Sequence, residues 1–92
     1  MNNAYVKLYT LDPVFAHSTF LAAYTWPTSK QALDAFTRAK ALFSVELPDA
    51  AYAANLYLGR DKLLDSFWIG ETGLKDVRKT CWTEASLFHE VI

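Results

Sequence analysis

The apolar residues of this chain change their period at Pro27, and that change constrains the fold more than any other feature of the sequence. Before Pro27, apolar and polar residues alternate, which indicates strands whose two sides differ. After it, apolar residues recur three and four positions apart, as on one face of a helix. Proline has no N–H to donate to a sheet, so the strand has to end there. The chain must therefore combine a sheet and a helix in one core.

Two strands are expected before Pro27. The first spans residues 4–11 and ends at Asp12-Pro13, a turn-forming pair. One of its sides carries Val6 and Leu8, and the other carries Tyr5, Lys7 and Tyr9. The second spans residues 18–26, with Phe20, Ala22, Tyr24 and Trp26 on one side and Thr19, Leu21, Ala23 and Thr25 on the other. Because both sides of this strand are fairly apolar, we expect a central strand.

A helix is expected directly after Pro27. Thr28-Ser29-Lys30-Gln31 matches a capping box, in which the threonine oxygen accepts from a backbone N–H and the glutamine side chain reaches back. The helical pattern continues through Val45, and Leu47-Pro48-Asp49 breaks it. The apolar positions at helical spacing are Ala32, Leu33, Phe36, Ala39 and Phe43.

The next segment, residues 50–59, is ambiguous. Its alanines favour a helix that would end at Gly59, whereas Tyr52, Leu56 and Leu58 alternate as in a strand. We favour the strand because Gly59-Arg60-Asp61-Lys62 fits a tight turn and residues 63–69 fit a second strand, which together make a β-hairpin.

A second helix is predicted at the end of the chain. Leu74, Val77, Cys81, Ala85, Phe88 and Ile92 recur at three- and four-residue spacing. Thr80 and Thr83 are poor residues for a helix interior, so the helix could break near Trp82 and restart with Thr83 as its N-cap.

The order β-β-α-β-β-α predicts a small α+β fold, with an antiparallel sheet of about four strands and two helices packed on one face. A chain of 92 residues accommodates one compact domain, residues 1–92. The other face of the sheet would then be open, with Tyr5, Tyr9 and one side of the second strand on it. A contiguous exposed apolar area of that kind usually marks a partner site.

Composition adds an expectation about assembly. The hydrophobic fraction of 52% argues against disorder, but a core this small stabilises a chain only marginally, and the single cysteine, Cys81, can form no internal disulfide. The aromatic fraction of 15% exceeds what one small core usually needs, and aromatic residues are enriched at interfaces. A homodimer is therefore one expectation.

Charge and hydropathy exclude several partners. The net charge of −1 offers no global attraction to phosphate, so nucleic acid is not expected as a general target. No apolar run approaches the roughly 20 residues that span a bilayer, so no membrane contact is expected. The first residues lack the basic and apolar regions of a signal peptide, and one lone thiol fits a reducing compartment, so we expect a cytoplasmic protein.

The sequence carries no recognisable catalytic, metal or cofactor motif. His17 and His89 are the only histidines, and neither has an orienting partner at a spacing that indicates a triad with a serine or with Cys81. One cysteine and two distant histidines do not supply a zinc site, and three glycines do not make a phosphate-binding loop. We expect no enzyme, no metal and no cofactor.

Candidate binding residues fall into two groups. Spacing on the predicted second helix places three cations and an indole on one face: Lys75, Arg78, Lys79 and Trp82. Such a face could meet an acidic protein surface, although a solvent-facing helix with its tryptophan in the core is the simpler interpretation. The second group consists of aromatic anchors: Tyr5, Tyr9, Tyr57 and Trp68.

Three functions compete at this point. The first is a protein-interaction module that occludes a partner surface, the class of compact proteins to which anti-CRISPR-like, phage-encoded inhibitors of bacterial defence systems belong. The second is a dimer that binds or sequesters a nucleotide-like anion in an aromatic groove. The third is an enzyme that uses His17 or His89 as a general base. Without a catalytic signature, we favour the interaction module.

Overall fold

The computed structural model describes residues 4–12, 17–46, 49–60, 62–78 and 87–89 of the chain. Within them the elements are β1 (Ala4–Asp12), β2 (His17–Trp26), α1 (Ser29–Phe43), β3 (Tyr52–Leu58), β4 (Lys62–Ile69), α2 (Gly73–Asp76) and β5 (Leu87–His89). The strands form one antiparallel sheet in the order β4-β3-β1-β2-β5, with β1 in the middle.

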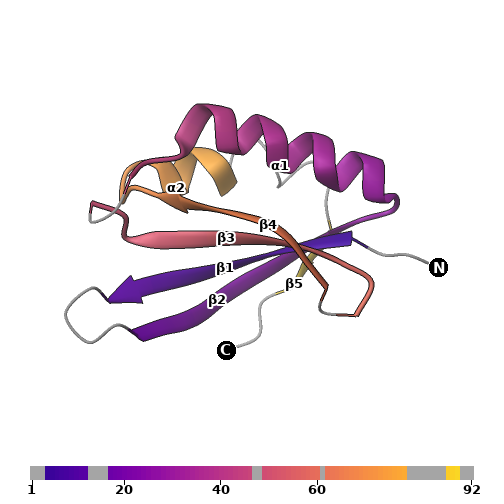
Figure 1. Ribbon diagram of the computed structural model, residues 1–92, viewed down its shortest axis with the longest axis horizontal. Helices are drawn as coiled ribbons and strands as arrows, with labels where there is room; N and C mark the ends of the chain where they lie inside the picture. The colour runs from indigo at the N-terminus through magenta and orange to yellow at the C-terminus, as the bar shows by residue number, and fades with distance from the viewer. Residues whose placement is uncertain (1–3, 13–16, 47–48, 61, 79–86, 90–92) are drawn as a thin grey trace.

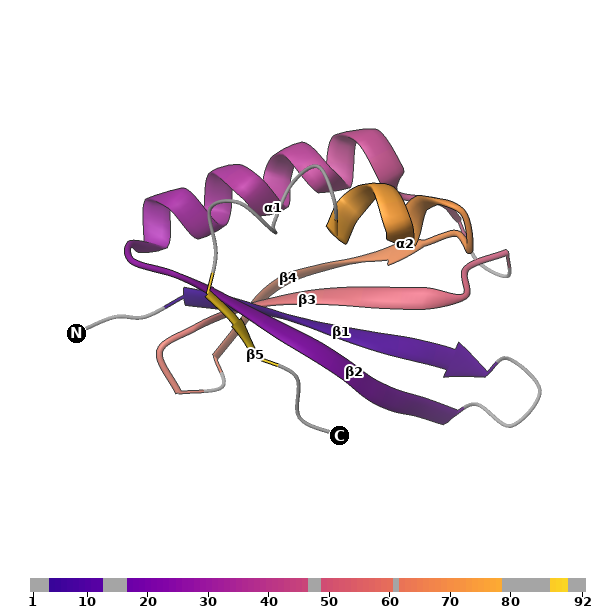
Figure 2. The same cartoon turned by 180° about the vertical axis from the view of Figure 1, so that it is seen from behind.

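Both helices lie on the same face of this sheet (Figures 1 and 2). The predicted α+β class, the antiparallel sheet and the one-sided helices are therefore confirmed. The predicted position of the second strand inside the sheet is also confirmed, because β2 lies between β1 and β5. No helix in the described part of the chain is long and apolar enough to span a membrane.

The N-terminus of α1 is fixed by the predicted cap. Thr28 has an extended backbone, and its hydroxyl oxygen accepts a hydrogen bond from the Gln31 N–H at 3.2 Å. The same hydroxyl lies 3.3 Å from Gln31 Oε1, to which it can donate. The glutamine side chain thus returns to the cap threonine, as the sequence indicates, and closes the first turn.

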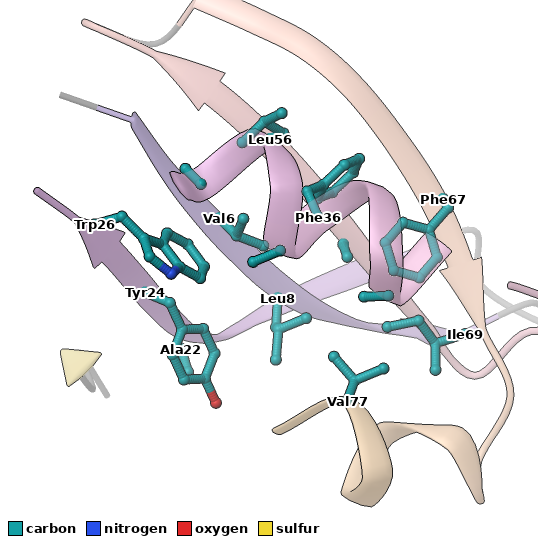
Figure 3. Close-up of a cluster of buried hydrophobic side chains, with 14 of the residues drawn as sticks. Val6, Leu8, Ala22, Tyr24, Trp26, Phe36, Leu56, Phe67, Ile69 and Val77 are labelled. Atoms are coloured by element: carbon teal, nitrogen blue, oxygen red, sulfur yellow. The ribbon is translucent and has the colours of Figure 1, made fainter. Parts of the chain in front are cut away.

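One stripe of α1 packs on the sheet. The buried residues of the helix are Ala32, Ala35, Phe36 and Ala39, and Phe36 meets Phe67 of β4 edge to face at 5.1 Å between ring centroids. Leu33, which was predicted on this stripe, is 50% exposed at its edge. Figure 3 shows the core between helix and sheet. Its largest fully buried side chains are Tyr24, Phe36, Phe67, Leu8, Leu56, Ile69, Val6 and Val77.

A β-bulge corrects one predicted side assignment. Leu8 of β1 is opposite Ala22 of β2, but Tyr9 is opposite Phe20, so Leu21 is an additional residue in β2. Leu21 packs against the core, and Phe20 contacts Tyr9 on the other side of the sheet. The prediction that placed Phe20 with Ala22 was wrong because simple alternation cannot register an inserted residue.

The ambiguous segment is a strand. β3 pairs with β4 through a hairpin in which Gly59 adopts φ 65°, a conformation that favours glycine. The strand interpretation is confirmed and the helical alternative is wrong. Pairing with β1 on its other side explains the outcome, because two neighbouring strands outweigh the helix preference of the alanines.

The predicted C-terminal helix is largely wrong. It begins near Leu74, but α2 contains only four residues, and Phe88 belongs to β5, which pairs with β2. This pairing supplies backbone partners along Tyr24 and its neighbours that a helix could not supply. Cys81, Trp82, Ala85 and Ile92 lie outside the described residues.

The cap of α1 gives a direct stability test. Thr28→Ala removes the acceptor for the Gln31 N–H and should lower the free energy of unfolding by about 1 kcal/mol. Thr37→Ala, in the exposed interior of the same helix, is the matched control and should leave stability unchanged or raise it slightly. Urea unfolding followed by circular dichroism measures both. Equal effects of the two substitutions would contradict the capping role.

Candidate binding face

The side of the sheet away from α1 and α2 is covered by no described helix (Figures 1 and 2). We call it the open face. Strand alternation and register place these residues on it: Tyr5, Lys7, Tyr9, Phe20, Ala23, Thr25, Ala53, Asn55, Tyr57, Leu63, Ser66 and Trp68. Most are half-buried, which is the exposure expected for a sheet surface without a second layer.

Cross-strand register arranges these residues in three parallel rows. The aromatic row is Trp68, Ala53, Tyr9 and Phe20; the polar row is Ser66, Asn55, Lys7 and Ala23; the tyrosine row is Leu63, Tyr57, Tyr5 and Thr25. Strand β5 continues the polar row at the register position of His89 and the tyrosine row at that of Leu87. Successive rows are two residues apart along each strand, or roughly 7 Å. The polar row therefore lies between two apolar, aromatic rows.

The aromatic row combines a half-buried ring pair with one exposed tryptophan. Tyr9 and Phe20 pack edge to face with their ring centroids 5.9 Å apart and their planes at 76°. Trp68, on the edge strand β4, is 41% exposed at the end of the row. Cross-strand aromatic pairs of this kind hold their side chains in place, so a partner would meet a surface that is already ordered.

The tyrosine row contains a stacked ring pair. Tyr5 and Tyr57 are directly opposite each other, and their rings stack with centroids 5.2 Å apart at 16°. The ammonium of Lys7 lies 5.4 Å from the Tyr5 centroid and 5.3 Å from the Tyr57 centroid. Both distances are in the range of a cation–π contact, so the two rings jointly position this charge.

The sequence-predicted binding residues separate into two places. Tyr5, Tyr9, Tyr57 and Trp68 come together on the open face. Lys75 belongs to α2, on the opposite side of the sheet, and Arg78 follows it. Lys79 and Trp82 lie outside the described residues.

Arg78 has a structural contact. Its Nε donates to the hydroxyl of Tyr24 at 2.9 Å, and Tyr24 is fully buried under the helices. A buried phenol needs a hydrogen-bond partner, and Arg78 provides it. This contact gives Arg78 a structural role, in support of the core.

Lys7, Asn55 and Phe20 of the open face were not among the predicted binding residues. Lys7 could have been included, because the sequence already places it on one strand side between Tyr5 and Tyr9. Asn55 donates from Nδ2 to the Tyr57 hydroxyl at 3.3 Å, which depends on the orientation of two side chains of β3. Phe20 joins the face only through the bulge in β2.

Some backbone groups of the edge strand β4 already have hydrogen-bond partners, which leaves fewer of them for pairing with a strand of another chain. Trp68 O accepts from the Val45 N–H at 2.8 Å, so this carbonyl points away from β3 and is satisfied. Ser66 is two residues away, and its N–H donates to Asp65 Oδ1 at 2.8 Å. Lys40 holds the Asp65 carboxylate in an ion pair of 2.8 Å. These devices disfavour strand addition at this edge.

The described residues also line two surface cavities. One, of about 380 Å³ at the β4 edge, includes Ser66 and Trp68 of the open face and is lined by Lys40, Ser44, Val45, Glu46, Ser66, Phe67 and Trp68. The other, of about 290 Å³, is lined by Ala4, Ser29, Lys30, Leu33, Leu56, Leu58 and Leu64. Among the described residues, no group of three or more histidine, cysteine, aspartate or glutamate side chains is placed to hold a metal ion. His17 is exposed at the start of β2.

Comparisons of this chain with known protein families, with curated proteins and with solved structures found no match.

The Arg78 contact predicts that replacing Arg78 destabilises the protein more than replacing Lys75, the other described cation of this segment. Arg78→Ala leaves the buried Tyr24 hydroxyl without this donor and should destabilise the protein by about 1 to 2 kcal/mol. Lys75→Ala, at an exposed position of α2, should change stability by less than about 0.5 kcal/mol. Thermal unfolding of both variants measures the difference. Equal stabilities would show that the Arg78 contact contributes nothing.

The Lys40–Asp65 pair predicts a small pH effect. The hydrogen bond from Lys40 lowers the pKa of Asp65 below its ordinary value of 3.8, so the pair stabilises the fold above that pH and is lost as pH falls through the lowered pKa. The two side chains are 43% and 46% exposed, so solvent screening limits the effect to less than about 1 kcal/mol.

Asp65→Asn tests this pair. The wild type should be slightly more stable than the variant at pH 7, and the two should converge under strongly acidic conditions, in urea titrations at a series of pH values. The control Asp34→Asn, on the exposed side of α1, should show no such convergence. A difference between wild type and Asp65→Asn that is constant with pH would exclude the ion pair as its source.

Proposed function

We propose that this protein is a non-enzymatic interaction module that covers a partner protein with the open face of its sheet. The observation that carries the proposal is the one-sided arrangement of the layers. The helices lie on one face, while an aromatic row and a tyrosine row lie on the other. The tyrosines of these rows are half-buried and Trp68 is exposed, and tyrosine and tryptophan are among the residue types that provide most binding energy at protein interfaces.

The route of binding follows from the same geometry. The edge strand β4 carries a backbone contact from Val45 and a side-chain contact from Asp65, both of which disfavour pairing with a strand of another chain. Binding through the face instead uses side chains that are already packed, so little conformational entropy is lost. Occlusion of a surface needs no catalytic group.

We further propose a biological setting for this module. Its small size and the absence of a catalytic pattern in its sequence fit an inhibitor of the kind that phages encode against bacterial defence systems. The single cysteine fits a reducing compartment, so we propose that the partner is met in the cytoplasm.

Paired variants test the proposed function. The partner is isolated from the native host with the tagged protein, and its affinity is measured by calorimetry. Tyr9→Ala together with Trp68→Ala should weaken binding at least tenfold, about 1.4 kcal/mol, because both rings belong to the aromatic row. Leu42→Ala, a truncation of a side chain that is 62% exposed on α1, is the control and should bind normally. Loss of binding only in the control would place the interface on the helices.

A further inference from the structure

The second surface cavity lies where the first turns of α1 meet the sheet. Its volume of about 290 Å³ is close to the lower end of the range for small-molecule sites, roughly 300 to 1,000 Å³. Residues of α1, β1, β3 and β4 line it: Ala4, Ser29, Lys30, Leu33, Leu56, Leu58 and Leu64. Because α1 forms one wall, the cavity is on the helix side of the sheet, away from the open face (Figure 1).

A β-bulge in β4 brings one of these leucines to the cavity. Leu56 of β3 is opposite Asp65 of β4, but Tyr57 is opposite Leu63, so Leu64 is an additional residue in β4. A bulge of this kind redirects the side chain of the inserted residue. Leu64 accordingly lines the cavity, next to the start of α1.

The walls of the cavity are aliphatic, and its polar groups lie together. Every described lining residue except Ser29 and Lys30 is a leucine or an alanine. Ser29 and Lys30 are consecutive at the start of α1, so a hydroxyl and an ammonium are next to each other beside the apolar walls. Leu33 and Leu64 are 50% and 47% exposed, and a ligand that covers them removes apolar surface from water. This arrangement fits a molecule with an aliphatic tail and a polar head group.

The charge at the cavity indicates that the head group is an anion. None of the described lining residues is acidic, and α1 has no acidic residue in its first turn. Within the described part of the chain, the Lys30 side chain forms no ion pair, whereas Lys40 binds Asp65 at 2.8 Å. One ammonium and one hydroxyl supply the charge and the donors for a single carboxylate.

Other small ligands match this cavity less well. A nucleotide base binds by stacking on aromatic rings, and no aromatic side chain is among the described lining residues. A phosphate ester carries up to two negative charges, which a single lysine does not neutralise. A cationic amphiphile would meet the like charge of Lys30.

We propose that this cavity binds a medium-chain aliphatic carboxylate, a fatty acid too short to need a larger cavity. The carboxylate binds to Lys30 and Ser29, and the tail covers Leu33 and Leu64. Lys30 thereby determines the preference for an anionic head group, and the leucines provide the affinity. The site is separate from the open face, so this inference does not rest on the proposed function.

A ligand series with the wild-type protein tests the site. Octanoate, 1-octanol and octylamine share one tail and differ in charge, and amide chemical shifts of the isotope-labelled protein follow their binding. Octanoate should shift the amides of Lys30, Leu33 and Leu64 with half-saturation below about 5 mM. Octanol should bind about threefold more weakly, because one exposed ion pair contributes little, and octylamine at least about tenfold more weakly. Hexanoate, which is two methylene groups shorter, should also bind about tenfold more weakly.

Variants of the cavity separate the contributions of head group and tail. Lys30→Met keeps the length of the side chain and should abolish the preference for octanoate over octanol, whereas Lys75→Met on α2 should leave it unchanged. Leu64→Asn should weaken the binding of all three ligands about fivefold. Leu42→Asn, the same substitution at a residue that is 62% exposed on α1 and does not line the cavity, should bind as the wild type does.

Several results would overturn the inference. These are the absence of shifts at Lys30 and Leu33 up to about 5 mM octanoate, equal binding of octanoate and octylamine, or an octanoate preference that survives Lys30→Met. A concentration-dependent dimer that Leu64→Asn abolishes would show that a second copy of the chain covers the cavity instead. Octanoate should leave the amides of the open face around Lys7 unchanged, so failure of this site and failure of the proposed function are distinguishable.

Discussion

The packing of the buried stripe of α1 on the sheet is the interaction on which the rest of the structure depends. Phe36 meets Phe67 of β4 edge to face, and the small residues Ala32, Ala35 and Ala39 let the helix backbone approach the strands. Because α1 and α2 both lie on this side, the described chain has no element that could cover the other face. The amphipathic stripe of α1 thus determines which surface is core and which stays open.

The register between strands determines which side chains are neighbours on the open face. The bulge in β2 moves Phe20 beside Tyr9, and the pairing of β1 with β3 places Tyr5 against Tyr57. Lys7 lies between these aromatic groups on the middle strand. At protein interfaces a few well-packed aromatic anchors provide most of the binding energy, and the ordered aromatic and tyrosine rows supply side chains of that kind.

Local signals in the sequence predicted most of the sheet and its helix. Alternation of Val6 and Leu8 with Tyr5 and Lys7 was sufficient for β1, and the Thr28 capping box was sufficient for the start of α1. The bulge at Leu21 could not be predicted, because it is defined by how β2 pairs with β1 and not by the residues of β2 alone. β5 was missed because its residues continue a helical spacing, and only pairing with β2, far away in the sequence, makes them a strand. Four of the predicted anchors lie on the open face. Their arrangement in rows could not be predicted, because it depends on the register between strands.

The most direct test of this account is amide chemical-shift mapping of the isotope-labelled protein bound to its purified partner. We predict that the largest shifts fall on β1 and β3, around Lys7 and Asn55, and that the exposed side of α1 stays unchanged. Shifts concentrated on α1 or around Lys75, with the open face unaffected, would contradict the claim that this protein binds through the uncovered side of its sheet.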